Sequence, residues 1–291
     1  MNFIRQEKSN RLVLKKYKGL AGNKRYHQFA KLLIDLGGYN INIYNSALPK
    51  DIDRIISVDV ERSVNHNKSK SQVRYILTQL YYYYNDYNQG LAYIATFLSC
   101  FVHKDVVVNV MRDVLVEKMH RNVWKTSLIH LREEMHVLEQ ICGEGVLEGM
   151  SKSDMHFQFF LQKYVFTMFI NVFSEEYLLE YFKNFLTREN YHYLVISSIM
   201  KQVYIEKNYD DESLGKICVM MGVMSNLPES IQKRSLEDAK FNYISSDRVR
   251  NWIDEGRLIA ETKIVIIDDD GNTEDEISLY SDDSEEDCDI V

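Results

Sequence analysis

The sequence predicts an all-α fold. Only two prolines, Pro49 and Pro228, occur among 291 residues, so long stretches lack the residue that most strongly interrupts a helix. Apolar residues recur at helical spacing in several of these stretches. Because 45% of the residues are hydrophobic, the chain can bury one large core or two moderate ones, which permits a domain of two lobes.

The apolar spacing locates the helices along the chain. Residues 72–84 carry a clear amphipathic stripe, with apolar residues three and four positions apart. Residues 107–115 and 128–141 repeat the pattern, with charged residues between the apolar ones. Three further segments are rich in aromatic residues, apolar on more than one face, and expected to form the core of the second lobe: residues 164–173, 176–186 and 191–205.

Residue types typical of helix ends support the same division. Gly37 and Gly38 follow an apolar segment and are expected to end its helix. Ser174 stands before two glutamates, which resembles an N-cap followed by acidic residues in the first turn. Residues 245–247 can cap a last helix that runs through residues 252–257.

The C-terminal segment has a different composition. Residues 261–267 are expected to form at most one short strand, and from residue 268 the chain is acidic and poor in apolar residues, so disorder is expected. Residues 259–291 hold thirteen acids and one base, a local charge of −12, so the formal net charge of −8 leaves +4 for the rest. This mild excess is not the concentrated basic patch of a nucleic-acid-binding protein, and no such partner is predicted.

Composition also bears on the compartment. The four cysteines lie far apart, with neither a CxxC pair nor the spacing of a zinc site, which indicates a reducing cytosol. The most apolar stretch, residues 91–101, is about half the roughly 20 residues that a membrane span needs. Residues 1–18 are basic and lack the apolar core of a secretory signal. A cytoplasmic location is therefore expected.

Two short segments carry side chains suited to phosphoryl transfer. Asp59 and Arg62 are three positions apart, so on a helix the carboxylate is expected to reach the guanidinium and hold it in one direction. Gln89 precedes Gly90 between two predicted helices, and a glycine lets a backbone approach a ligand closely. A fixed guanidinium can neutralise charge on phosphate oxygens, while a fixed amide can donate to the phosphate and accept from the attacking water.

In these segments the sequence resembles the TBC domain, the catalytic domain of Rab GTPase-activating proteins. The family motif IxxDxxR(T) is matched by Ile56, Asp59, Arg62 and Ser63, and the motif YxQG by Tyr87, Gln89 and Gly90. The motif RxxxW is matched imperfectly by Arg25 through Phe29, and residues 160–169 resemble a later stretch in which the family usually has tryptophan at the position of Tyr164. The resemblance covers most of the chain before the acidic tail.

The resemblance implies a two-lobed, all-α TBC-like domain that inserts an arginine and a glutamine in trans into a partner GTPase. By position, Arg62 and Gln89 inherit these catalytic roles, and Arg25 is expected to orient neighbouring helices. The supporting residues within the two motifs are Ile56, Asp59, Tyr87 and Gly90. The partner, a Rab-like small GTPase, would hold GTP and Mg²⁺, so no cofactor or metal of the chain's own is implied. Membrane association is expected only through that partner, in vesicle trafficking, and the oligomeric state is left open.

The predicted division is a basic lead-in over residues 1–19, a TBC-like domain over 20–257 and an acidic tail over 258–291. Within the domain, the N-lobe with the motifs covers about 20–115 and the C-lobe about 116–257.

Some positions depart from the family pattern. Four of the departures are mild: tryptophan is replaced by Phe29 and by Tyr164, threonine by Ser63, and methionine by Leu91. Lys183, by contrast, occupies a position where the family often has an aspartate. The connection from Arg62 to Gln89 is also short, and residues 65–71 within it resemble a trimmed polar loop. These features support a second hypothesis, a catalytically inactive TBC-like module that binds a GTPase or scaffolds a trafficking complex.

A remote alternative is a di-metal carboxylate bundle. It rests on three ExxH spacings, which are Glu117 with His120, Glu133 with His136, and Glu189 with His192. A glutamate three residues before a histidine is common on solvated helix faces, so this spacing discriminates poorly. The tyrosine run is expected to pack Tyr81 and Tyr84 inward, with Tyr82 and Tyr83 on the flanking surface.

Overall fold

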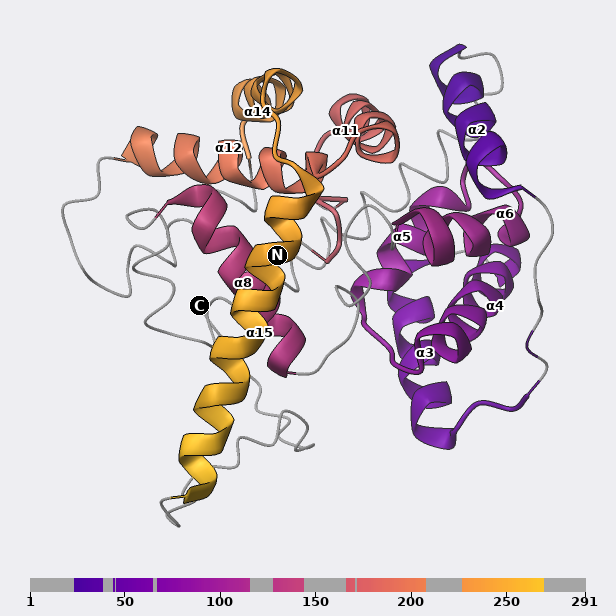
Figure 1. Ribbon diagram of the computed structural model, residues 1–291. Coiled ribbons are helices and arrows are strands. Elements are labelled where there is room, and N and C mark those ends of the chain that lie inside the picture. The colour runs from indigo at the N-terminus through magenta and orange to yellow at the C-terminus, as the bar shows by residue number, and fades with distance from the viewer. Residues whose placement is uncertain are drawn as a thin grey trace, which may run out of the picture.

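The computed structural model describes residues 24–38, 44, 46–64, 67–115, 128–143, 166–170, 172–207 and 227–269. Every regular element in these ranges is a helix, which confirms the predicted all-α class, and the helices form two lobes (Figure 1). Within the same ranges, no helix is long and apolar enough to cross a membrane. The predicted lead-in and the acidic tail beyond residue 269 lie outside the described residues.

The N-terminal lobe is built around α4. Its elements are α2 (Lys24–Gly37), α3 (Lys50–Ser63), α4 (Asn67–Tyr84), α5 (Gly90–Leu98), α6 (Lys104–Asn109) and a π-helical turn η1 (Val110–Val114). The stripe predicted over residues 72–84 is buried, with Ile76, Leu77 and Leu80 fully enclosed, and α4 contacts α3, α5 and α6. Because α4 already begins at Asn67, the prediction of a polar loop is wrong for residues 67–71.

The tyrosines at the end of α4 lie as predicted. Tyr84 is buried and its hydroxyl donates to the carbonyl of Met111 (2.7 Å), while Tyr83 is exposed. Tyr81 is partly buried against the core, and the hydroxyl of Tyr82 donates to the carbonyl of Ala47 (2.6 Å). This run of tyrosines therefore serves packing within the lobe.

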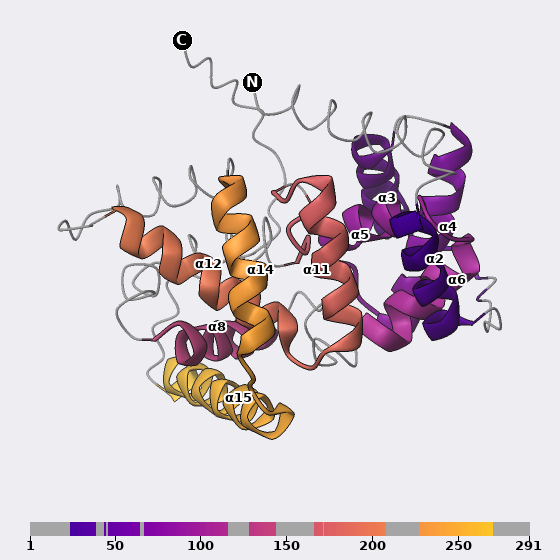
Figure 2. The same cartoon turned by 90° about the horizontal axis from the view of Figure 1, so that it is seen from above.

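The C-terminal lobe contains α8 (Leu128–Cys142), α11 (Glu175–Thr187), α12 (Tyr191–Lys207), α14 (Glu229–Phe241) and α15 (Ser246–Asp269). Viewed from above, α11 lies between the rest of this lobe and the N-terminal lobe (Figure 2). α11 and α12 confirm the helices predicted over residues 176–186 and 191–205. Gly38 ends α2 in the left-handed region (φ 60°), and Ser174 occupies the N-cap of α11 without a side-chain cap bond.

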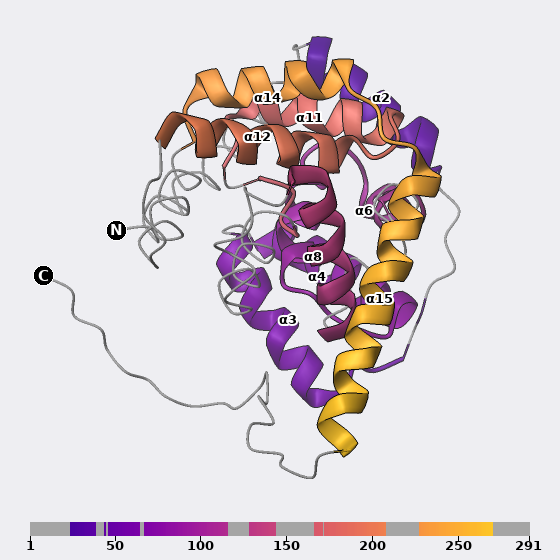
Figure 3. The same cartoon turned by 60° about the vertical axis from the view of Figure 1, so that its left-hand side comes forward.

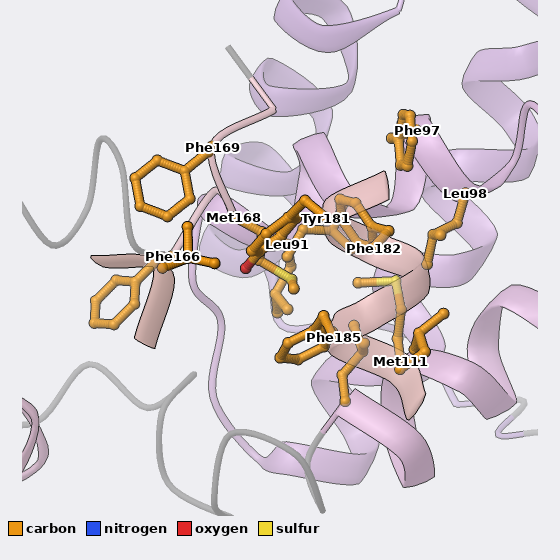
Figure 4. Packing of buried hydrophobic residues seen from close by; sticks show 14 of the residues in the cluster. Leu91, Phe97, Leu98, Met111, Phe166, Met168, Phe169, Tyr181, Phe182 and Phe185 are labelled. Atoms are coloured by element: carbon orange, nitrogen blue, oxygen red, sulfur yellow. The ribbon is translucent and has the colours of Figure 1, made fainter. Parts of the chain in front are cut away.

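The helix predicted over residues 164–173 is wrong in its described part. Residues 166–170 form turns, and Met168 (φ 50°) and Phe169 (φ 57°) lie in the left-handed region, which costs about 1–2 kcal/mol per residue. Both side chains, labelled in Figure 4, are fully buried. The ring of Phe169 stacks on that of Phe173, with the ring centres 5.2 Å apart. Burial of these rings therefore holds the segment in a conformation that helical periodicity does not predict.

The last helix is longer than predicted. α15 continues to Asp269, so the strand predicted over residues 261–267 is wrong, and position 257, where the domain was predicted to end, lies inside a helix. α15 packs closely along α8, and its C-terminal turns extend beyond the end of α8 (Figure 3). Gly256 permits the close approach, because a Cβ there would lie 2.9 Å from the Cβ of His136.

Aromatic side chains join the two lobes. Phe182 of α11 lies 4.8 Å from the ring of Phe97 in α5 and 6.4 Å from that of Phe29 in α2. Phe29 also contacts Phe101 edge to face at 5.0 Å. Figure 4 shows Phe182 and its neighbours on α11 packed with residues of the N-terminal lobe such as Leu98. The lobes thus share one hydrophobic core.

Candidate functional site

Arg62 lies in the last turn of α3, and its side chain is exposed. Ile56, Val60 and Val64 are spaced four residues apart and buried, which turns the face that carries Val58 and Arg62 toward solvent. Among the described residues, the guanidinium of Arg62 has no hydrogen-bond or ion-pair partner. It is therefore available to an external ligand.

Asp59 does not form the ion pair predicted with Arg62. It is only 6% exposed, and its Oδ2 instead accepts a hydrogen bond from the hydroxyl of Tyr87 (2.9 Å). Burial raises the pKa of Asp59, while the Tyr87 hydrogen bond and the positive charge of Arg62 oppose the rise. The prediction from the three-residue spacing missed this hydrogen bond, because helical spacing describes neighbours on one helix, whereas Tyr87 comes from another segment. The bond joins residues 56–63 to residues 87–90, which we call the finger segments.

The connection between α4 and α5 presents Gln89 to solvent. Asn85 ends α4 in the left-handed region (φ 53°), and its N–H donates to the carbonyl of Tyr81 (2.8 Å). Asn88 is buried, and its Oδ1 accepts from the N–H of Gly90 (2.8 Å), one of the otherwise unpaired donors at the start of α5. Gln89 is therefore held between two fixed neighbours. Sequence reasoning missed Asn88, although an asparagine two residues before a predicted helical N–H is a recognisable cap signal.

Gly90 lies against the backbone of a residue that is distant in the sequence. A Cβ at this position would lie 2.6 Å from the carbonyl oxygen and 2.9 Å from the carbonyl carbon of Phe166, a residue of the C-terminal part of the chain. The absence of a Cβ thus lets the backbone of Phe166 come close to the start of α5. Phe166 thus packs against Gly90 in the finger segment of residues 87–90, and no sequence pattern predicts this contact.

Arg25 lies apart from the finger segments. Its Nη1 donates to Oε1 of Glu176 in α11 (2.6 Å), and both side chains are largely exposed. The hydrogen bond and the charge of Glu176 raise the pKa of Arg25. This ion pair between α2 and α11 agrees with the expected role in orienting helices.

The structure therefore brings together most of the predicted site residues. Asp59 and Arg62 come from α3, Tyr87 and Gln89 from the connection before α5, and Gly90 from the first position of α5, which contacts α3. Ile56 is fully buried beneath them, one turn before Val60 on α3. Lys183 is exposed on α11.

The ExxH residues that are described have partners within the fold. Glu133 is fully buried and bonded by Nε of Arg257 (2.6 Å) and by Nδ1 of His130 (3.0 Å); burial raises its pKa, but these two bonds together lower it below the usual value. His192 is buried beside the hydroxyl of Tyr181, and burial lowers its pKa to about 3. In the part of the chain that the structure describes, no group of three or more His, Cys, Asp or Glu residues could hold a metal ion. The pair at residues 117–120 lies outside it.

Comparison with known proteins gives a family. No curated protein matches the chain closely enough to add a named relative. The family model of the Rab-GTPase-TBC domain matches residues 14–207, two thirds of the 291 residues, and this range contains Arg25 and both finger segments. α14 and α15 lie beyond it. The chain therefore belongs to the Rab-GTPase-TBC domain family, which implies a Rab GTPase as its partner.

Proposed function

We propose that the chain accelerates GTP hydrolysis by a Rab-like small GTPase, with Arg62 and Gln89 inserted in trans. The observation that carries this proposal is the hydrogen bond from Tyr87 to Asp59 (2.9 Å), because it ties the two finger segments together beneath two exposed side chains. Arg62 is three residues from one end of this bond and Gln89 is two residues from the other. Both side chains therefore project from segments with a common anchor.

The chemistry follows from the two functional groups. The guanidinium of Arg62 neutralises negative charge that develops on the phosphate oxygens, and it breaks no bond to a described residue when it enters the partner's site. The amide of Gln89 donates to the phosphate and accepts from the attacking water. GTP and Mg²⁺ are held by the partner. The residues beneath, Asp59, Tyr87 and Asn88, are positioning residues that limit the directions in which the two groups can point.

Single-turnover GTP hydrolysis with a panel of Rab GTPases tests the proposal. An arginine inserted in trans typically contributes about 10³ to 10⁵ in rate, so Arg62→Ala should remove an acceleration of that order. Gln89→Ala should also slow hydrolysis strongly. Arg234→Ala is the matched control, because Arg234 is an exposed arginine on α14. The proposal fails if no GTPase is accelerated, or if Arg62→Ala and Gln89→Ala both leave the rate unchanged.

A second candidate is a TBC-like module that binds a GTPase without accelerating hydrolysis. Lys183 favours it, because this exposed lysine of α11 replaces an aspartate that is common in the family the sequence resembles. The same panel separates the two candidates. Saturable binding of a GTP-loaded Rab with an unchanged hydrolysis rate would identify the binding module.

We further propose that the chain works in the cytoplasm at endomembranes, in vesicle trafficking. Support comes from the Rab partner that family membership implies. Fluorescence microscopy of the tagged full chain beside organelle markers tests this location, and a signal that coincides with no endomembrane marker would contradict it.

A further inference from the structure

The exposed face of α3 carries one apolar residue beside Arg62. Val58 is 41% exposed and stands four positions before Arg62, so the two side chains lie one turn apart on the same face of the helix. Among the large hydrophobic residues that the structure describes as exposed, Val58 is the only one on α3 or α5. The other exposed residues of α3 are all charged: Lys50, Asp51, Arg54, Glu61 and Arg62.

The outer face of α5 begins at Gln89 and continues with Tyr93. Gln89 already has helical backbone angles (φ −58°, ψ −29°), so Tyr93, four positions later, lies one turn away on the same face. Within α5 every residue is buried except Tyr93 and Thr96, which are partly exposed. The hydroxyl of Thr96 donates to the carbonyl of Ala92 (2.7 Å). The ring of Tyr93 is therefore the apolar group that this face presents next to Gln89.

Val58 and Tyr93 both lie beside the hydrogen bond that joins the finger segments. α3 and α5 contact each other in the N-terminal lobe (Figure 1), and Asp59, which accepts that bond, directly follows Val58. Burial and the charge of Asp59 raise the pKa of Tyr87, and Tyr93 adds to the rise, which requires the two phenols to be near each other. The two apolar side chains thus stand on either side of the anchored segments.

We infer that Val58 and Tyr93, which we call the apolar flank, are covered by apolar side chains of the GTPase that border its nucleotide site. This inference rests on the proposed function, because insertion of Arg62 and Gln89 brings the partner's surface over residues one helical turn away, about 5.4 Å along the axis. A stable interface buries about 800 Å² on each partner, far more than two inserted side chains supply, so the contact extends to their neighbours. The centre of an interface is also depleted in charged residues and enriched in aromatic ones.

The two pairs of residues therefore divide the work. The apolar flank supplies affinity and selects among GTPases by the apolar surface that each one offers, while Arg62 and Gln89 supply the rate.

The affinity of the full chain for Rab GTPases tests the inference without hydrolysis. Each GTPase of the panel is loaded with a non-hydrolysable GTP analogue, and binding is measured by isothermal titration calorimetry. The double variant Val58→Ser, Tyr93→Ser should bind about tenfold more weakly than the wild type, equivalent to about 1.4 kcal/mol. Val58→Ser alone should weaken binding about threefold, because it removes one half-exposed apolar side chain.

Two matched variants control for the substitution itself. Val58→Ile keeps an apolar side chain at the flank and should bind like the wild type. Ile259→Ser removes an apolar side chain of similar exposure (43%) from α15 and should also bind like the wild type. Serine has a helix propensity close to those of valine, isoleucine and tyrosine, so the helices should be retained, and circular dichroism checks that all variants fold equally.

Hydrolysis rates separate this inference from the proposed function. In single-turnover assays the double variant should need about tenfold more chain for the half-maximal rate, while its rate at saturation stays within about twofold of the wild type. Weaker binding by the serine variants, with no acceleration by the wild type, would refute the proposed function alone. Acceleration by the wild type, with equal affinities of the wild type and both serine variants, would refute the inference alone. The inference is also overturned if no Rab binds the wild type. It is equally overturned if the serine changes alter only self-association in size-exclusion chromatography, because the flank would then bind a second copy of the chain.

Discussion

Replacing Tyr87 by phenylalanine removes one hydroxyl from the bond that joins the finger segments. That bond runs from the Tyr87 hydroxyl to Oδ2 of Asp59 at 2.9 Å, and the two residues are 8% and 6% exposed. A hydrogen bond to a charged group contributes about 1.5–3 kcal/mol, and leaving a buried acceptor unsatisfied costs about 1–3 kcal/mol. We therefore expect Tyr87→Phe to lower the free energy of unfolding by about 2 kcal/mol.

Tyr84→Phe is the matched control for this change. Tyr84 is also buried, but its hydroxyl donates to a neutral acceptor, the carbonyl of Met111 (2.7 Å), so its loss should cost about 1 kcal/mol. Urea denaturation followed by circular dichroism measures both values. Single-turnover hydrolysis should slow at least tenfold in Tyr87→Phe, because the finger segments lose their common anchor, and less than twofold in Tyr84→Phe.

The same variant changes the dependence of stability on pH. Burial raises the pKa of Asp59 in the folded chain, against the opposing effects of Tyr87 and Arg62. A carboxyl group with a raised folded pKa stabilises the fold fully below its unfolded pKa and loses that contribution as pH rises through the folded pKa. Removing the hydroxyl raises the folded pKa further, so the loss of stability in Tyr87→Phe should be larger at pH 7 than at pH 4. An equal loss at both pH values, together with unchanged hydrolysis, would refute the proposed role of the bond.

Four further variants probe two close packing contacts, an exposed ion pair and the buried histidine. Gly90→Ala places a Cβ 2.6 Å from the carbonyl oxygen of Phe166, so it should lower the free energy of unfolding by about 1–3 kcal/mol and slow hydrolysis. Gly256→Ala places a Cβ against α8 at a similar distance, so it should also lower the free energy of unfolding, but the hydrolysis rate per folded molecule should stay unchanged. Thermal melts measure the stability of both variants and single-turnover assays measure their rates. Equal slowing of hydrolysis by Gly90→Ala and Gly256→Ala would contradict a specific role of the Gly90 contact. Arg25→Ala removes an exposed ion pair, so its urea midpoint should shift far less than that of Gly90→Ala, and a comparable shift would show that the pair does more than orient helices. His192 stays neutral when folded, with a pKa of about 3, whereas the unfolded chain takes up the proton near pH 6.5. Protonation of His192 in the unfolded chain should therefore lower the free energy of unfolding by about 2 kcal/mol between pH 7 and pH 5. Urea denaturation of the wild type and of His192→Asn at several pH values measures this difference. Parallel stability curves for the two proteins over this range would contradict the prediction.

Helical periodicity correctly predicted helices that bury one face against the core. The stripe over residues 72–84 became α4, and the glutamates after Ser174 marked the start of α11. The same reasoning failed at residues 166–170, where packing of Phe169 against Phe173 and Tyr181 imposes left-handed backbone conformations. It also failed at residues 261–267, which continue α15 instead of forming a strand. At residues 166–170 the contact of Phe169 with Tyr181, twelve positions away, is one that helical periodicity does not represent.

For the site, the sequence predicted which residues stand out but not how they are held. Arg62 and Gln89 were identified from two motifs, and both are exposed. The partner of Asp59 was predicted as Arg62 because of helical spacing, yet the hydroxyl of Tyr87, 28 positions away, takes that place. The contact of Gly90 with Phe166 depends on the packing of the second lobe, which no local pattern records.

We propose that Arg62 and Gln89 act together on one nucleotide. The most direct test is the affinity of the full chain for a Rab GTPase loaded with GDP and aluminium fluoride, which imitates the phosphoryl group in the transition state, compared with the same GTPase loaded with GDP alone. We predict that the wild type binds the aluminium fluoride form at least about 100-fold more tightly, since transition-state analogues gain that much or more over ground states. Both Arg62→Ala and Gln89→Ala should lose most of this preference. Equal affinity of the wild type for the two forms, or an undiminished preference in either variant, would show that the two side chains do not act together on the nucleotide.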